Sequence, residues 1–197
     1  MNLEKQLIRN LKSLLVKTVP QNYHSFRSTN LKYLNNPLSA LGSAIVGGRF
    51  NPKGFEALYT SLEIETMIAE MQHYAQTDPR LAGRFRPSSI LTLQSSDLRT
   101  LDLSSLDTQV LLGTNTQELG GNFIRMQNRG LESPTQTLGR VNIEHGFFDA
   151  FIVESARTDN GKNLVIFPSV AQKNNCIVNL FDPENVLPTL QILPHLE

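Results

Sequence analysis

The chain has 197 residues, which suits a single domain with a sizeable core, and its hydrophobic and charged fractions are those of a globular protein. Eighteen basic residues balance eighteen acidic ones, which argues against a nucleic-acid-binding protein because such proteins carry a basic excess. No run of about 18 apolar residues and no basic-then-apolar leader is present, so we expect a cytoplasmic protein without a membrane span. A lone Cys176 excludes an internal disulfide, and its apolar surroundings in the sequence predict a buried, inert thiol.

The first half of the chain begins with a predicted helix. Leucines recur at helical spacing over residues 3–18, and Pro20 marks the end of this amphipathic segment. Residues 22–50 are rich in Asn, Ser, Pro and Gly and are expected to be irregular, apart from a short strand at 23–27. A second short strand is expected at 57–59.

The clearest helix follows that strand. Thr60 and Glu63 match a capping box, and Ile64, Met67 and Met71 begin an apolar stripe. Helical geometry places Glu70 at the rim of the stripe, where a carboxylate is half-buried. Such a position suits a catalytic carboxylate or a structural ion pair, and periodicity alone favours the ion pair.

The second half of the chain is expected to be rich in β-structure. A strand is predicted at 89–93, whereas 94–134 shows no clear pattern and is expected to be a loop insertion or lid. A short helix at 135–145 should precede a hairpin whose strands, 148–154 and 163–167, flank a turn at 158–161. Together with a last strand at 177–181, these pieces predict an α+β fold.

Common site motifs are absent from the sequence. It has no Walker loop, no Gly-x-Gly-x-x-Gly fingerprint and no Gly-x-Ser-x-Gly elbow. Its four histidines are scattered and have no cysteine companions, so no metal site is expected.

Several segments, in order, resemble the RES domain family, which is named after its arginine, glutamate and serine. They comprise Phe-Arg at 26–27, Gly-Gly-Arg-Phe-Asn at 47–51, Leu-Tyr-Thr-Ser at 58–61 with Ile-Ala-Glu at 68–70, Gly-Phe-Phe-Asp-Ala at 146–150 with Glu-Ser-Ala-Arg at 154–157, and Asn-Leu-Val-Ile-Phe at 163–167. Phe50, Phe148 and Glu154 depart from the Trp, Gly and Pro expected there. The segment between Glu70 and Gly146 is also longer than in compact members.

The resemblance implies an ADP-ribosyltransferase-like fold with a split, mixed or antiparallel β core and flanking helices. Residues 21–197 would form one RES-type catalytic domain, with the helix of residues 1–20 packed on it and the insertion at 94–134. It further implies that NAD⁺ is a substrate rather than a resident cofactor. A cognate antitoxin would cover the active site, and a homodimer is expected.

The resemblance also implies roles for particular residues. Glu70 would stabilise positive charge on the ribose, and Arg49 with Arg27 would hold the pyrophosphate, for which Lys32 and Lys53 are weaker candidates. Tyr59 would stack on nicotinamide or fix the ribose, although packing in the core explains a tyrosine there equally well. Ser155, with Ser169 as its rival, would orient Glu70 or a ribose hydroxyl, and Ser61 would support the nicotinamide pocket or cap the helix.

Nicotinamide leaves NAD⁺ as a neutral base and needs no general acid, so one carboxylate is enough. The resulting hypothesis is a toxin-like NAD⁺ glycohydrolase. A protein ADP-ribosyltransferase using the same pocket is the alternative, and Ile68, two residues before Glu70, disfavours arginine as the acceptor because arginine-modifying transferases carry a second glutamate there. A third hypothesis is an inactive module that binds NAD⁺ or a partner.

Overall fold

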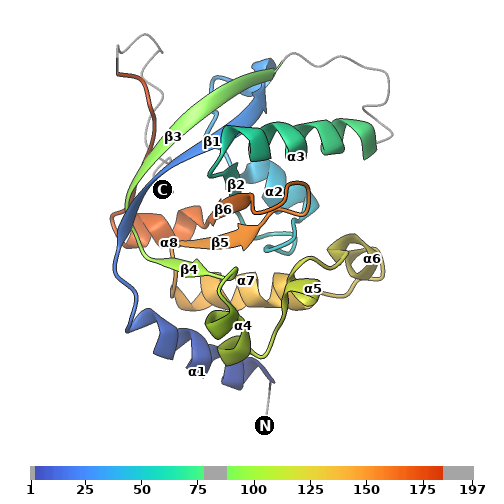
Figure 1. Ribbon diagram of the computed structural model, residues 1–197, viewed down its shortest axis with the longest axis vertical. Helices are drawn as coiled ribbons and strands as arrows, with labels where there is room; N and C mark the ends of the chain where they lie inside the picture. Colours follow the sequence, from blue (N-terminus) through green and yellow to red (C-terminus); the bar gives the residue numbers. More distant parts are fainter. Residues whose placement is uncertain (1–2, 78–87, 184–197) are drawn as a thin grey trace.

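The computed structural model describes residues 3–77 and 88–183, which form a seven-stranded sheet with helices around it (Figure 1). The strands are β1 (Gln21–Asn30), β2 (Leu58–Ser61), β3 (Ser88–Leu98), β4 (Thr100–Asp102), β5 (Ala150–Glu154), β6 (Lys162–Ile166) and β7 (Ile177–Leu180). The helices are α1 (Leu3–Leu15), η1 (Leu31–Tyr33), α2 (Leu41–Val46), α3 (Ile64–Thr77), α4 (Leu106–Leu112), α5 (Thr116–Leu119), α6 (Phe123–Gln127), α7 (Pro134–His145) and α8 (Pro168–Lys173).

The sheet is mixed but mainly antiparallel, with the strand order β4-β5-β6-β2-β1-β3-β7. The β4–β5 pair is parallel, and the other neighbouring pairs are antiparallel. β1 pairs with β3 along its whole length, whereas it meets β2 only where Phe26 lies opposite Ser61. The two halves of the sheet therefore separate at its middle, and the expected α+β fold with a split, mixed core is confirmed.

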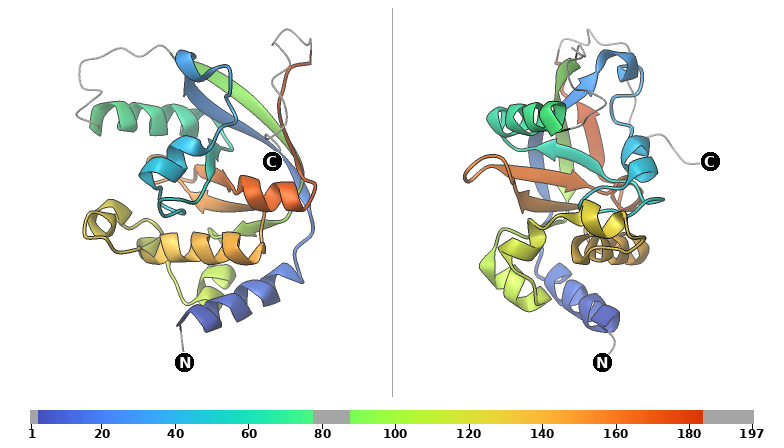
Figure 2. Two further views of the ribbon diagram at one scale, coloured as in Figure 1. Left: turned by 180° about the vertical axis from the view of Figure 1, so that it is seen from behind. Right: turned by 90° about the vertical axis from the view of Figure 1, so that its right-hand side faces the viewer.

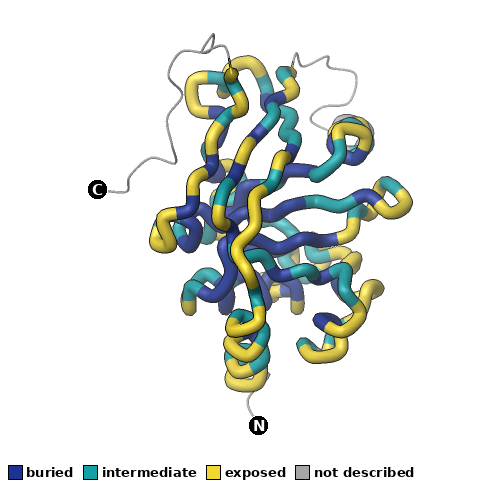
Figure 3. Tube along the Cα trace, turned by 60° about the vertical axis from the view of Figure 1, so that its left-hand side comes forward, coloured by how far each residue is buried: buried dark blue, intermediate teal, exposed yellow. Residues whose placement is uncertain are grey.

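Two apolar clusters lie on the two faces of the sheet. One contains Phe50, Phe151 and Val165, and the other contains Leu91, Leu164 and Ile166. Because side chains alternate along a strand, neighbouring residues of one strand contribute to opposite clusters. Figure 3 shows the buried backbone, in dark blue, running through the middle of the sheet, while α1 near the N-terminus has an exposed outer side.

The helices cover the sheet unevenly. In the views of Figures 1 and 2, α3 and α7 lie on opposite sides of the β5–β6 hairpin, and α7 lies between the sheet and α1. Leu11 of α1 is fully buried in the same cluster as Val141 of α7. In Figures 1 and 2 the tip of the β5–β6 hairpin projects between α3 and the α4–α5 segment.

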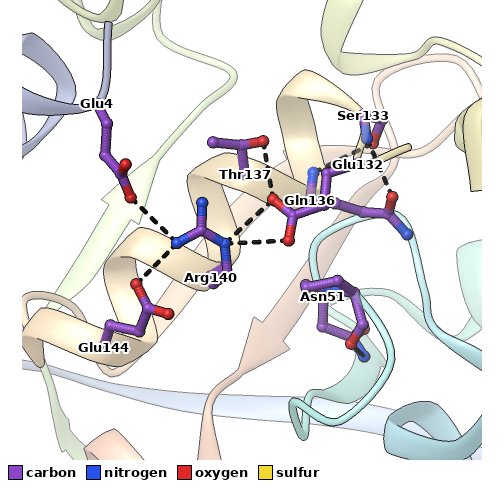
Figure 4. A network of polar contacts seen from close by, with 9 residues as sticks. Glu4, Asn51, Glu132, Ser133, Gln136, Thr137, Arg140 and Glu144 are labelled. Atoms are coloured by element: carbon purple, nitrogen blue, oxygen red, sulfur yellow. Dashed lines mark hydrogen bonds and ion pairs between the residues drawn. The ribbon is translucent and has the colours of Figure 1, made fainter. Parts of the chain in front are cut away.

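α7 is fixed at both ends and along one side. Ser133 and Gln136 form a capping box at its start, and the left-handed Gly146 ends it. Arg140 contacts the carboxylates of Glu4, Glu132 and Glu144 (Figure 4), so one guanidinium joins α1 to α7.

Several predicted elements are found at the expected places, including α1, α7 and the hairpin with its turn at 158–161. The predictions for the region of β1 and for Thr60 were wrong. β1 is a ten-residue strand rather than a short piece in an irregular region, because β3 pairs with it throughout. Thr60 does not cap α3, because it belongs to β2 and its hydroxyl donates to the carbonyl of Leu164.

The segment 94–134, expected to be a loop, is largely regular. It contains the end of β3, then β4, and then α4, α5 and α6. The division of the chain into residues 1–20 and 21–197 stays a prediction, and 184–197 lie outside the described residues. No helix within 3–77 and 88–183 has the length and apolar character needed to cross a membrane.

Candidate functional site

The Gly-Gly-Arg-Phe-Asn segment forms a tight loop that presents Arg49. Gly47 has a φ of 78°, and a side chain at Gly48 would collide with the Tyr59 hydroxyl and with Asn51. Phe50 is buried in the core, and the fully buried Asn51 donates to the carbonyls of Ser43 and Phe55. These contacts fix the backbone and leave the half-buried Arg49 as the charged side chain that the loop supplies.

Tyr59 holds this loop from the sheet. Its hydroxyl accepts from the backbone N–H of Phe50 at 3.0 Å and donates to Asn51 Oδ1 at 2.8 Å. Burial raises the pKa of Tyr59 above its ordinary value, although the hydrogen bond from Phe50 and the positive charge of Arg49 oppose the shift. Tyr59 therefore lies near Arg49 and keeps its hydroxyl engaged within the protein, while the expected stacking on nicotinamide stays a prediction.

Helices α6 and α7 support the same loop from the other side. The Gln136 side chain donates to the carbonyl of Gly48 and to Gln127, and Gln127 donates to the carbonyl of Val46. α7 approaches so closely that a β-carbon on Gly139 would overlap the carbonyl of Phe50. The position of Arg49 thus depends on three separate parts of the chain.

Glu70 lies on α3 and is held by two neutral donors. Its Oε1 accepts from Ser155 Oγ at 2.7 Å and from Asn163 Nδ2 at 3.0 Å. Within the described residues Glu70 forms no ion pair. The structural ion pair that periodicity favoured is therefore not formed there, and a half-buried carboxylate is held in place without a neutralising cation.

A small cavity of about 140 Å³ connects these parts. Arg49, Glu154 and Ser155 line it together with apolar side chains. The other lining residues are Phe50, Leu103, Gln109, Thr116, Leu119, Gly120, Val153 and Ala156. Glu70 and Tyr59 do not line the cavity themselves, but Glu70 contacts the lining residue Ser155 and Tyr59 contacts the lining residue Phe50. The Arg49 guanidinium makes no hydrogen bond or ion pair within the described part of the chain, so its charge is available to a ligand.

One wall of the cavity comes from the segment that the sequence left unassigned. Gln109 of α4 is buried, donates to the carbonyl of Leu103 at 2.8 Å and accepts from Thr116 at 3.3 Å. These bonds join α4 to the start of α5, so part of 94–134 is built into the candidate site. Sequence patterns missed these residues because helices of four to seven residues are too short for a clear apolar period.

Ser61 and Asn163 form a second line of contacts behind Glu70. Ser61 Oγ donates to Asn163 Oδ1 at 2.7 Å, so Ser61 does not cap α3. The sequence predicts only that Asn163 begins a strand. Its contact with Glu70 makes it a further residue of the candidate site.

Arg27 lies elsewhere. It is opposite Leu91 in the β1–β3 pairing, on the face of the second cluster, whereas Ser61 is opposite Phe26 on the other face. Its Nη2 donates to the carbonyl of Ser39, and its buried Nη1 has no hydrogen-bond partner among the described residues. Burial lowers the pKa of Arg27 to about 10. The structure does not bring Arg27 to the cavity of Arg49 and Ser155, and its expected role stays a prediction.

Within the described residues, the weaker candidates form no hydrogen bond or ion pair with Glu70. Ser169 is in α8, so Ser155 is the serine that contacts Glu70. Lys32 lies over the ring of Tyr33, and Lys53 is exposed beyond the Arg49 loop. Among the residues described, no group of three or more His, Cys, Asp or Glu could hold a metal ion.

The fold and the site define an α+β protein in which an arginine loop and a hairpin serine line one cavity, and a helix-borne glutamate contacts that serine. A model of the RES domain matches residues 24–184, and the chain belongs to this family. No curated protein sequence matches the chain. In fold, the chain is similar to one in the crystal structure of the M. tuberculosis MbcT–MbcA toxin–antitoxin complex, with a TM-score of 0.66 and 21% identity over 83% of this chain and 82% of that chain.

Proposed function

We propose that this protein is the toxin of a toxin–antitoxin pair and that it hydrolyses the bond between nicotinamide and ribose in NAD⁺. The proposal is supported by membership of the RES domain family and by the fold shared with a chain of a toxin–antitoxin complex. The observation that carries it is the carboxylate of Glu70, held by Ser155 and Asn163 beside a cavity lined by the unpaired Arg49.

In the proposed reaction, nicotinamide departs as a neutral base and leaves positive charge on C1′ of the ribose. Water then adds to C1′, so NAD⁺ and water yield nicotinamide, ADP-ribose and a proton. Glu70 supplies a fixed negative charge next to the electron-poor sugar, which lowers the energy of the transition state. Because the donors to Glu70 are neutral, no cation within residues 3–77 and 88–183 competes for that charge.

Arg49 binds the pyrophosphate in this proposal. Guanidinium groups bind phosphate oxygens in pairs, and a guanidinium without a carboxylate partner has this capacity free. The cavity of about 140 Å³ is smaller than the roughly 300–1,000 Å³ of sites that enclose a whole small-molecule ligand. It therefore takes one end of the dinucleotide, and the remainder lies on the surface beside Arg49.

The test is the release of nicotinamide from NAD⁺ by the purified protein, followed by chromatography. Glu70→Gln should lower the rate by about 10²–10³ because it removes the negative charge at the reacting sugar. Glu65→Gln, an exposed change in the first turn of the same helix, is the matched control and should leave the rate unchanged. Equal turnover by folded Glu70→Gln protein would refute the mechanism.

The same assay separates the other hypotheses. Label from NAD⁺ attached to a protein, with little free ADP-ribose, would identify a transferase. Saturable binding of NAD⁺ without nicotinamide would identify a binding module. The proposal also includes a cognate antitoxin, a homodimer and a cytoplasmic location. Co-purification with the product of an adjacent gene tests for the antitoxin.

A further inference from the structure

Asn163 lies between two residues of the candidate site, and its amide contacts both. Asn163 Oδ1 accepts from Ser61 Oγ at 2.7 Å, and Asn163 Nδ2 donates to Glu70 Oε1 at 3.0 Å. We propose that Asn163 is a positioning residue that fixes the carboxylate of Glu70 for reaction. The inference rests on the proposed function and deepens it.

The contact with Glu70 sets the orientation of the amide. If the amide were turned over, its oxygen would face a carboxylate oxygen, and two acceptors would meet without a proton between them. The Ser61 hydroxyl can then satisfy Oδ1 by donating to it, which is the arrangement found. Both ends of the amide are occupied, so the nitrogen that faces Glu70 has a fixed direction.

The backbone at Asn163 is well suited to this task. Asn163 pairs with Ser61 of β2 on one side and with Val153 of β5 on the other, so it lies on an interior strand of the sheet. Glu70, in contrast, projects from a helix, and Ser155 follows the end of β5 where the turn begins. Because strand pairing holds the backbone of Asn163 on both sides, its amide can keep the carboxylate of Glu70 in one orientation.

The two donors both act on one oxygen of Glu70. With Oε1 engaged by Ser155 and Asn163, Oε2 accepts no hydrogen bond from the residues that the structure describes, and in the proposed reaction it is the oxygen that faces the ribose. Both polar ends of the Asn163 amide are engaged, by Ser61 and by Glu70, so Asn163 acts on the substrate through Glu70. Its loss should therefore change the chemical step more than the binding of NAD⁺.

The experiment uses Asn163→Ala and the nearly isosteric Asn163→Asp in the full chain. Asn163→Ala should lower kcat by about ten- to a hundredfold and leave KM within about threefold, since the carboxylate loses its fixed geometry. Asn163→Asp places a second carboxylate against Glu70, so the acidic limb of the pH–rate profile should move to higher pH by about 1 unit or more. Asn179→Asp, the same change at an exposed position of β7, is the matched control and should move neither quantity.

A second measurement does not depend on turnover. The titration of Glu70, followed by NMR on carboxyl-labelled glutamate, should shift to higher pH in Asn163→Asp and stay unchanged in Asn179→Asp. If it does not shift, or if folded Asn163→Ala keeps the kcat of the unmodified protein, the inference is overturned. If the unmodified protein releases no nicotinamide, the proposed function fails, whereas the NMR titration still decides whether Asn163 controls Glu70.

Discussion

Ser155 Oγ lies 2.7 Å from Glu70 Oε1, although 85 residues separate them in the chain. The contact joins the end of β5 to α3, and the same hydroxyl accepts from the backbone N–H of Arg157. Ser155 thus has a donor on one side and a carboxylate on the other, and none of the histidines in the described part of the chain forms a hydrogen bond with it. This arrangement fits an orienting hydroxyl and gives no support to a nucleophile.

Replacing Ser155 should weaken catalysis without abolishing it. Ser155→Ala removes one hydrogen bond to a charged acceptor, so we expect kcat for nicotinamide release to fall by about tenfold. Ser169→Ala, which changes the rival serine in α8, is the control and should leave kcat unchanged. Complete loss of turnover, together with a covalent adduct on Ser155 in the unmodified protein, would show that the serine attacks the substrate.

The two arginines should respond differently to the same substitution. Arg49→Met removes the free guanidinium beside the cavity, and we expect KM for NAD⁺ to rise by about tenfold or more. Arg27 lies on the opposite face of the sheet, so Arg27→Met should raise KM by less. Steady-state kinetics give KM for NAD⁺ in both variants, and thermal unfolding checks that both are folded. If Arg27→Met raised KM as much as Arg49→Met, Arg27 would also take part in binding NAD⁺.

Tyr59→Phe should loosen the loop that carries Arg49. The change removes the acceptor of the Phe50 N–H and the donor to Asn51, and leaving such buried groups unpaired costs about 1–3 kcal/mol each. We therefore expect a lower free energy of unfolding and a raised KM, measured by denaturant titration and kinetics. Unchanged values for both would contradict the role of the hydroxyl in holding the loop.

The pH dependence of stability should also report on Tyr59. Because burial raises its pKa above the ordinary value, the folded and unfolded states both keep the proton below about pH 10. Above that pH the unfolded chain ionises first, so the free energy of unfolding should fall, and it should fall less in Tyr59→Phe. Absorbance near the phenolate band, read during alkaline unfolding, follows the ionisation directly.

Cys176 should react slowly with thiol reagents in the folded protein. It is buried, its Sγ contacts the carbonyl of Asp97, and burial with the nearby charge of Asp149 raises its pKa to about 12. At pH 8 we expect labelling only as the chain opens, and rapid labelling after addition of denaturant. Fast labelling of the native protein would show that the thiol is accessible.

The site was partly predictable because its chemistry is carried by short motifs. Arg49, Glu70 and Ser155 stand in segments that resemble the family, and the structure joins them at or beside one cavity. Asn163 was missed because a polar side chain in a strand leaves no periodic signal. Asn163 contacts Ser61 and Glu70 only in the folded protein, where β6 pairs with β2 and α3 packs beside these strands.

Two other features of the structure depend on strand pairing, which local sequence patterns do not reveal. A strand's register decides which face each side chain takes, and a shift of one residue reverses it, so the sequence could not place Arg27. Thr60 followed by Glu63 matched a helix cap, but pairing with β6 kept Thr60 in a strand and gave its hydroxyl to Leu164. At Thr60, contacts between distant segments therefore overruled the local pattern.

The overlap that a β-carbon on Gly139 would make with the Phe50 carbonyl has a bearing on how the protein tolerates mutation. In a library that samples every amino acid at each position, we expect position 139 to accept glycine alone, even though it is far from Glu70 in the chain. A methyl group there would push α7 off the arginine loop, so the library would mark as indispensable a residue that has no side chain and performs no chemistry.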